Sequence, residues 1–168
     1  MNLQECFRKR LLRRDRPDPA RARRSLEVAR EKLKHARRAH EHELYDASLV
    51  LGYTSMFHAA RALLFNDGIV EKSHVCLVEY LRENYARRGR LSEGLVNTLD
   101  RLRVDRHEAI YGLEASVEKD QAEYALEKSE EFIRIARGLL PRPVKVKAVH
   151  AKWGKEAFPD AGEATFRD

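Results

Sequence analysis

The stretch LVLGYTSMFHAARALLF, residues 49–65, decides the fold of this chain. Its apolar side chains fall on nearly every side of a helix, and few polar residues, such as His58 and Arg61, interrupt them. A helix of this kind must be covered on most sides, so we predict a central helix over about residues 46–65. Because His58 and Arg61 break the apolar run, and a membrane span needs about 20 apolar residues, we expect no membrane contact.

The sequence on either side of this stretch predicts more helices. Asp18-Pro19 is a typical helix start, and small or apolar residues then recur at steps of three and four as far as His40. Three later segments have a similar period and begin at or near a serine: residues 73–89, 92–111 and 116–140. No segment within residues 18–140 alternates as a strand does, and the connections are short. We therefore predict an all-α protein, an up-down antiparallel bundle of four to five helices.

The chain of 168 residues is long enough for one domain with one core. We expect residues 1–17 to form a basic N-terminal arm or short helix, and residues 18–140 to form the bundle. Residues 141–168 are expected to be a flexible tail, although the alternation over residues 144–148 also fits a short edge strand.

The net charge of +6 is unevenly distributed, because residues 1–40 alone carry a net charge of +9. An arginine-rich arm can neutralise phosphates, so we interpret Arg10, Arg13 and Arg14 as candidate RNA contacts. The alternative is a solvated helix face without a ligand.

Several chemistries lack their sequence signals. There is no glycine-rich phosphate loop and no nucleophile elbow, and His35, His40 and His42 have the wrong spacing to share a metal. We expect no metal and no cofactor. The two cysteines are too few for a disulfide framework, and a reducing, cytoplasmic location is the simplest interpretation.

One polar residue occupies an apolar position. The segment 92–111 places Leu95, Leu99 and Leu102 on one stripe, and Arg106 continues that stripe. A guanidinium there is costly unless it is paired or faces a cleft or a second subunit. Arg106 therefore binds either a neighbouring carboxylate or carbonyl groups, for which Asp105 and Glu108 are candidates, or an anion such as phosphate.

A second set of polar residues lies on and after the central helix. His58 and Arg61 are three residues apart and share a helix face, and Lys72 and His74 flank the next expected helix start. These four residues are candidate nucleotide or RNA contacts. The alternatives are a satisfied core histidine at His58 and a loop-supporting role for His74.

Three segments together resemble the HEPN superfamily, in particular its small stand-alone prokaryotic members. They are GYTSMFHAARALLF at residues 52–65, KSH at residues 72–74 and RHEAIYG at residues 106–112. The resemblance covers about residues 20–140. It implies a dimeric helical bundle, and many members are metal-independent endoribonucleases that act as toxins beside a nucleotidyltransferase antitoxin. Others serve in phage defence or only bind nucleotides.

The family motif is an arginine followed by four to six residues and then a histidine at the dimer interface. Arg106 matches the arginine, but the fifth following residue is Tyr111, and a tyrosine hydroxyl, with an ordinary pKa near 10, is a poor base. His107 could replace the missing histidine, although it lies about 100° around an ideal helix from Arg106. Arg101 with His107 also fits the spacing, but Arg101 is expected to face solvent.

Two hypotheses follow from this resemblance. In the first, the protein is a toxin or defence ribonuclease with Arg106, His107 and Tyr111 in a composite site of a homodimer. In the second, it is a non-catalytic module that binds a nucleotide or a partner nucleotidyltransferase. A third hypothesis is a helical interaction protein in which Arg106 is merely structural.

Overall fold

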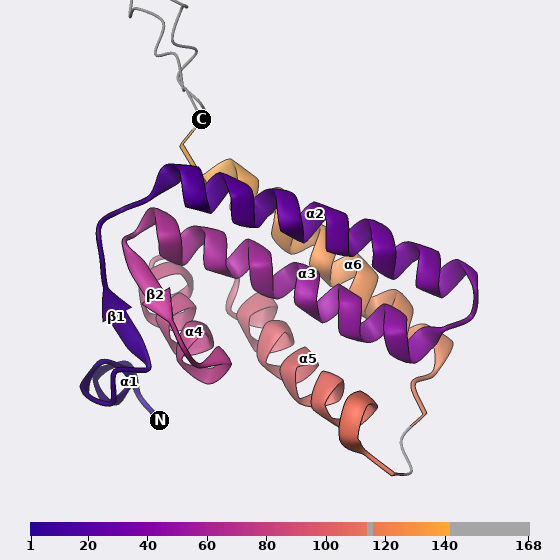
Figure 1. Ribbon diagram of the computed structural model, residues 1–168. Coiled ribbons are helices and arrows are strands. Elements are labelled where there is room, and N and C mark those ends of the chain that lie inside the picture. The colour runs from indigo at the N-terminus through magenta and orange to yellow at the C-terminus, as the bar shows by residue number, and fades with distance from the viewer. Residues whose placement is uncertain (114–115, 142–168) are drawn as a thin grey trace, which may run out of the picture.

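The computed structural model describes residues 1–113 and 116–141, and the expected tail lies outside this part from residue 142 onward. The described chain is mainly helical (Figure 1). Its elements are α1 (Leu3–Arg8), β1 (Leu12–Arg14), α2 (Pro19–Glu41), α3 (Tyr45–Asn66), β2 (Ile69–Glu71), α4 (His74–Leu81), the π-helical turn η1 (Arg82–Ala86), α5 (Glu93–Tyr111) and α6 (Lys119–Leu139). The all-α fold class predicted from the sequence is confirmed.

Helix α3 is the centre of the bundle, as predicted. It packs against α2, α4, α5 and α6, and most of its residues are buried. Figure 1 shows α2 and α5 on opposite sides of α3, with α6 behind. Since α3 is apolar on nearly every side, only an arrangement that covers it from several directions removes its side chains from water.

The predicted start and seam of α2 are also confirmed. The Asp18 carboxylate accepts a hydrogen bond from the backbone N–H of Arg21 at 2.8 Å, and Pro19 occupies the first helical position. The residues at steps of three and four are buried on α3 and α6: Ala22, Leu26, Ala29, Leu33 and Ala36. The seam is narrow and its residues are small, which allows α2 and α3 to pack closely.

The prediction that residues 18–140 contain no strand is wrong. Strand β2 pairs antiparallel with β1, with Leu12 opposite Glu71 and Arg14 opposite Ile69. Each strand has three residues, too few for a period of two to stand out in a sequence. Gly68, at φ +71°, turns the chain from α3 into β2, and a Cβ atom there would lie 2.5 Å from the Asp15 carbonyl oxygen.

The segment predicted as one helix over residues 73–89 changes its winding partway. Helix α4 ends at Leu81 and continues as η1, whose wider turn brings residues five apart to one side. The hydroxyl groups of Tyr80 and Tyr85 both donate to the Asp67 carboxylate, at 3.1 and 2.8 Å. Both hydroxyl groups thus reach one half-buried acceptor across the π-helical turn, which no periodicity in the sequence indicates.

The two cysteines, which are too few to predict a disulfide framework, form one disulfide. Cys6 of α1 is bonded to Cys76 of α4, and both side chains are fully buried. The first 14 residues are thus held on the bundle twice, by this bond and by the pairing of β1 with β2. The expectation of a reducing environment gains no support from this bond, because disulfides persist mainly in oxidising surroundings.

Reduction of this bond should lower the thermal stability of the protein. The disulfide closes a loop of 70 residues, and a crosslink over such a loop stabilises the folded state by about 2–4 kcal/mol. We expect 5 mM dithiothreitol to lower the melting temperature of the wild type by several degrees, measured by circular dichroism. The Cys6→Ser/Cys76→Ser variant is the control and should not respond to the reductant. Equal responses of the two proteins would contradict the prediction.

Candidate functional site

Arg106 lies on the inward stripe of α5, after the buried Leu99 and Leu102, and is itself half-buried. Its guanidinium carbon lies 5.4 Å from the centre of the Tyr53 ring of α3. Its Nε atom is buried, and no described residue accepts a hydrogen bond from it. The guanidinium therefore has donors to spare.

The two carboxylates proposed as structural partners of Arg106 lie elsewhere. Asp105 lies 3.9 Å from Arg101, and Glu108 lies 3.7 Å from the His107 ring. Among the described residues, neither carboxylate is within ion-pair distance of Arg106. This favours the interpretation in which Arg106 binds an anion such as phosphate.

Beside Arg106, two helices contribute a tyrosine and a histidine that contact each other. The Tyr53 hydroxyl is 2.6 Å from Nδ1 of His74, the first residue of α4. The Ser73 hydroxyl accepts a hydrogen bond from the Cys76 backbone N–H and so caps this helix start. The His74 ring also stacks on Phe57, with 4.0 Å between ring centres. These contacts fix the position and the orientation of the imidazole.

The surroundings keep both side chains of this pair uncharged. Burial, and then the positive charges of Arg106, Arg61 and Arg103, lower the pKa of His74 to about 4. Burial raises the pKa of the Tyr53 hydroxyl far above neutrality. His74 Nδ1 is the one described hydrogen-bond partner of the Tyr53 hydroxyl. Because a hydroxyl that accepted from Nδ1 would have no described acceptor for its own proton, we expect Tyr53 to donate to Nδ1. In this tautomer the His74 proton lies on Nε2, and the ring offers a second donor within reach of the Arg106 charge.

This protonation state can be measured by NMR of the histidine rings. We expect His74 to be the Nε2–H tautomer at pH 7 and to titrate near pH 4. Because its folded pKa lies below the ordinary 6.5, the unfolded state binds the proton more readily, and His74 reduces stability as the pH falls from about 6.5 to about 4. The Arg106→Gln variant removes one repulsive charge and should raise the pKa. A wild-type His74 that titrates near 6.5 would contradict this assignment.

Arg61 of α3 already has a carboxylate partner. The Arg61 Nε atom lies 2.7 Å from the Glu71 carboxylate, and the Arg61 guanidinium carbon lies 5.4 Å from the centre of the Phe57 ring. Glu71 is buried at the end of β2, and this burial raises its pKa. His58 is half-buried near Arg61, and burial and then the Arg61 charge lower its pKa. Arg61 and His58 thus lie near Arg106, Tyr53 and His74, which we call the Arg106 cluster. Arg61 itself forms an ion pair with Glu71.

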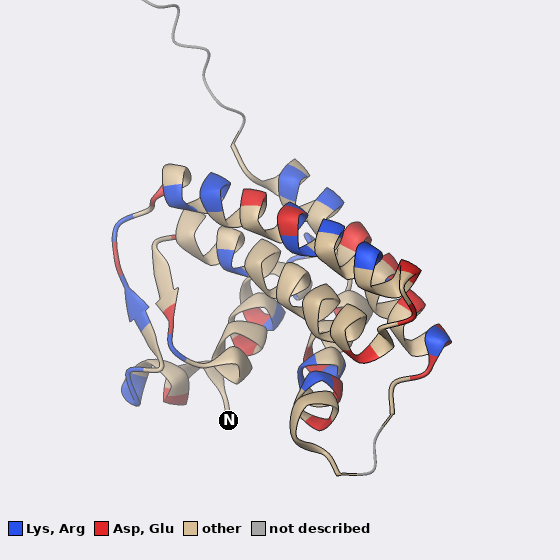
Figure 2. Cartoon of the chain, turned by 45° about the vertical axis from the view of Figure 1, so that its right-hand side comes forward, with Lys and Arg blue, Asp and Glu red and all other residues tan. Residues whose placement is uncertain are grey.

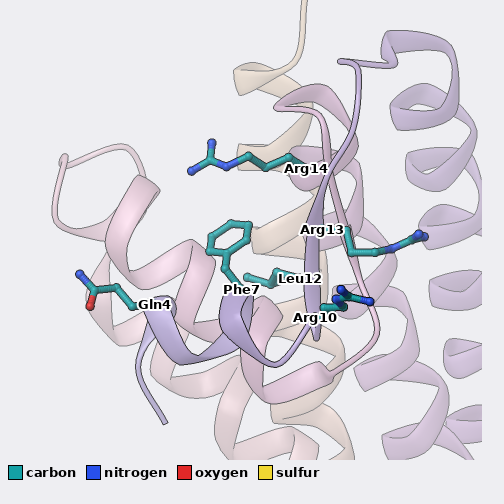
Figure 3. Close-up of a pocket in the computed structure, with 6 residues that line it drawn as sticks. All are labelled: Gln4, Phe7, Arg10, Leu12, Arg13 and Arg14. Carbon is teal, nitrogen blue, oxygen red and sulfur yellow. The ribbon is translucent and has the colours of Figure 1, made fainter.

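The candidate RNA contacts near the N-terminus lie apart from this cluster. Arg10, Arg13 and Arg14 line an open hollow of about 650 Å³ beside Phe7 (Figure 3). Figure 3 shows Arg14 on the Phe7 side of β1, whereas Arg13 extends from the other side, so the three guanidinium groups do not converge. Lys72 follows β2 and has an exposed side chain, and its backbone N–H donates to the Leu11 carbonyl.

His107 and Tyr111 lie on the outer face of α5. Their rings are 5.0 Å apart, and Tyr111 is 67% exposed. Three further apolar side chains are exposed at or just after the C-terminal end of α5: Val104, Ile110 and Leu113. One copy of the chain therefore does not bring His107 or Tyr111 together with the inward-facing Arg106.

Three residues around the site, Tyr53, Phe57 and Glu71, are not among the predicted site residues. Tyr53 and Phe57 are four residues apart and share a face of α3, and this spacing was a usable signal. Glu71 gave no signal, because it becomes buried only when β2 pairs with β1.

The fold and this cluster define a class of protein: a small helical bundle in which an inward-facing arginine of a late helix meets a tyrosine of the central helix. The chain belongs to the HEPN family, because residues 22–139 match the family model described as "HEPN domain". The resemblance stated from the sequence is thereby confirmed.

Two curated proteins of archaea are similar to this chain. "Putative toxin MJ0142" of Methanocaldococcus jannaschii is 28% identical over 108 residues, which are 64% of this chain and 74% of that protein. A "UPF0332 protein" of Archaeoglobus fulgidus is 31% identical over 115 residues, which are 67% of this chain and 89% of that protein. The relatives thus support the toxin-like branch of the family.

Two further properties concern the described residues alone. Within residues 1–113 and 116–141, no helix combines the length and the apolar character that a membrane crossing requires. In the same part of the chain, no three histidine, cysteine or acidic side chains gather as a metal site would require.

Proposed function

We propose that this HEPN protein is an RNA-directed toxin or defence protein that cleaves RNA without a metal ion. The observation that carries the proposal is the position of Arg106. Its guanidinium lies on the apolar stripe of α5, and no described residue accepts a hydrogen bond from its buried Nε atom. A planar guanidinium matches the oxygens of a phosphodiester, and keeping such a group unpaired in the fold is costly unless a ligand uses it.

In this proposal, Arg106 and the Nε2–H group of His74 hold the non-bridging oxygens of the scissile phosphate. The ribose 2′-oxygen attacks phosphorus, the bond from phosphorus to the 5′-oxygen breaks, and a 2′,3′-cyclic phosphate forms. The 5′-oxygen takes up a proton from water and leaves as a 5′-hydroxyl. Both donors stabilise the negative charge that accumulates on the phosphorane. His74 acts as a neutral donor here, and Tyr53 is the positioning residue that keeps the proton on Nε2.

A base must take the proton of the 2′-hydroxyl, and imidazole is the side chain used most often for this transfer. We assign this role to His107 of a second copy of the chain, beside Tyr111, because His107 faces outward from α5. The exposed apolar side chains of Val104 and Ile110 on α5, and of Leu113 just after it, favour a homodimer through this end of α5. The site is then composite, with Arg106 and His107 from different copies.

A second candidate function is a binding module for a nucleotide or a cognate nucleotidyltransferase antitoxin. The observation in its favour is that Tyr111, and not a histidine, stands five residues after Arg106. In that case Arg106 holds a phosphate and no bond is broken. Either function is expected in the cytoplasm, where RNA and nucleotides are available and where the disulfide would be exposed to reductants.

The deciding experiment is incubation of a mixed RNA pool with the wild-type protein in EDTA. We expect fragments that end in 2′,3′-cyclic phosphates, detected by sequencing after ligation specific for that end. Intact RNA, together with binding of the RNA or of a nucleotide, would overturn cleavage and favour the binding module.

A further inference from the structure

A groove between α2 and α6 gathers four arginines from two helices. Arg23 and Arg30 of α2 face Arg134 and Arg137 of α6 across a hollow of about 580 Å³. All four side chains are exposed. In Figure 2, basic segments mark both the first turns of α2 and the last turns of α6, where the chain leaves the bundle.

These arginines lack the carboxylate partners that their neighbours have. None of the four is within ion-pair distance of an acidic residue in the described ranges, whereas Arg37 of α2 lies 2.6 Å from Glu130 of α6. The groove has one acidic lining residue, Glu27. Its local charge is therefore strongly positive, and like charges this close repel one another unless an anion is bound.

Part of the groove lining is apolar. Leu26 and Leu140 line the groove with buried side chains, and Pro141 is a third apolar lining residue. Arginine forks together with an apolar lining fit a ligand that combines phosphates with flat, weakly polar rings. Arg23 and Arg30 are seven residues apart, which is about 10 Å along a helix and the length of about three stacked nucleotides.

We propose that this groove binds the phosphate backbone of a short segment of single-stranded RNA. The groove is separate from the Arg106 cluster, because α2 and α5 lie on opposite sides of α3 (Figure 1). The groove holds the RNA and breaks no bond, so the proposal goes beyond the proposed cleavage and does not require it. The proposal also places the main RNA-binding surface on the helical bundle, whereas the sequence predicts it in the N-terminal segment.

The test uses fluorescence polarisation with a labelled 2′-O-methyl oligouridine of 12 nucleotides. This probe lacks the 2′-hydroxyl, so its binding is independent of cleavage. We expect the Arg30→Ala/Arg137→Ala variant to bind at least about tenfold more weakly than the wild type. The slope of log affinity against log salt should fall by about 1.4, because two phosphate contacts are lost.

The control is Arg87→Ala/Arg88→Ala, which removes the same charge from exposed positions at the end of η1. It should bind as the wild type does, and circular dichroism should show both variants folded. Equal affinity of the groove variant and the wild type, or an equal loss in the control, would overturn the proposal. So would displacement of the probe by UMP as effectively as by unlabelled oligouridine at equal phosphate concentration, which would indicate a mononucleotide site.

Discussion

Replacement of Arg106 by alanine should reduce RNA cleavage in EDTA by about a hundredfold to a thousandfold. Loss of one preorganised donor to a developing oxyanion costs this much in enzymes, or about 2.7–4 kcal/mol of transition-state stabilisation. Arg106 has no carboxylate partner among the described residues, so its removal strands no buried charge. The effect should therefore fall on kcat and leave folding intact, measured from initial rates and from the melting temperature.

Arg101→Ala is the matched control for this experiment. Arg101 lies on the same helix, is exposed and lies 3.9 Å from Asp105. It also fits the family spacing to His107, so this variant tests the competing assignment of the motif arginine. Arg101→Ala should cleave within about threefold of the wild type, as surface changes away from a site usually do. Cleavage lost in Arg101→Ala and retained in Arg106→Ala would reverse the assignment.

Much of the fold follows from local signals in the sequence. Asp18-Pro19 predicts the start of α2, Ser92 predicts the start of α5, and the all-apolar segment predicts the covered helix α3. Arg106 is the best example for the site, because an arginine at a leucine position can be recognised from spacing alone. In each case the information lies within one helical turn or one periodic stripe.

The remaining features depend on residues that are distant in the chain. The disulfide joins Cys6 to Cys76, and Tyr85 of the π-helical turn donates to Asp67 on a preceding segment. The Tyr53–His74 pair arises where α3 and the start of α4 meet, which periodicity within either helix cannot specify. In the sequence, the four arginines of the groove look like parts of two separate solvated helix faces. Only the packing of α2 against α6 brings them together.

Replacement of His107 by alanine is expected to reduce cleavage by about a hundredfold to ten-thousandfold, the usual range for loss of a general base. His107 is exposed, so the variant should fold and dimerise as the wild type does, as checked by light scattering. His35→Ala, which removes another exposed histidine from α2, is the control and should leave the rate unchanged. Full activity of His107→Ala would exclude it as the base.

A mixture of the two inactive variants distinguishes a composite site from a site within one chain. If Arg106 and His107 act from different copies, each mixed dimer contains one intact pair, formed by the wild-type residue of each partner. Random exchange makes about half of the dimers mixed, with one working site of two, so the mixture should regain about 25% of wild-type activity. The mixture of Arg106→Ala and His107→Ala could also stay inactive after subunit exchange has been verified. That result would place both residues in a site within one chain. Because His107 faces outward and Arg106 faces Tyr53, we expect the activity to return.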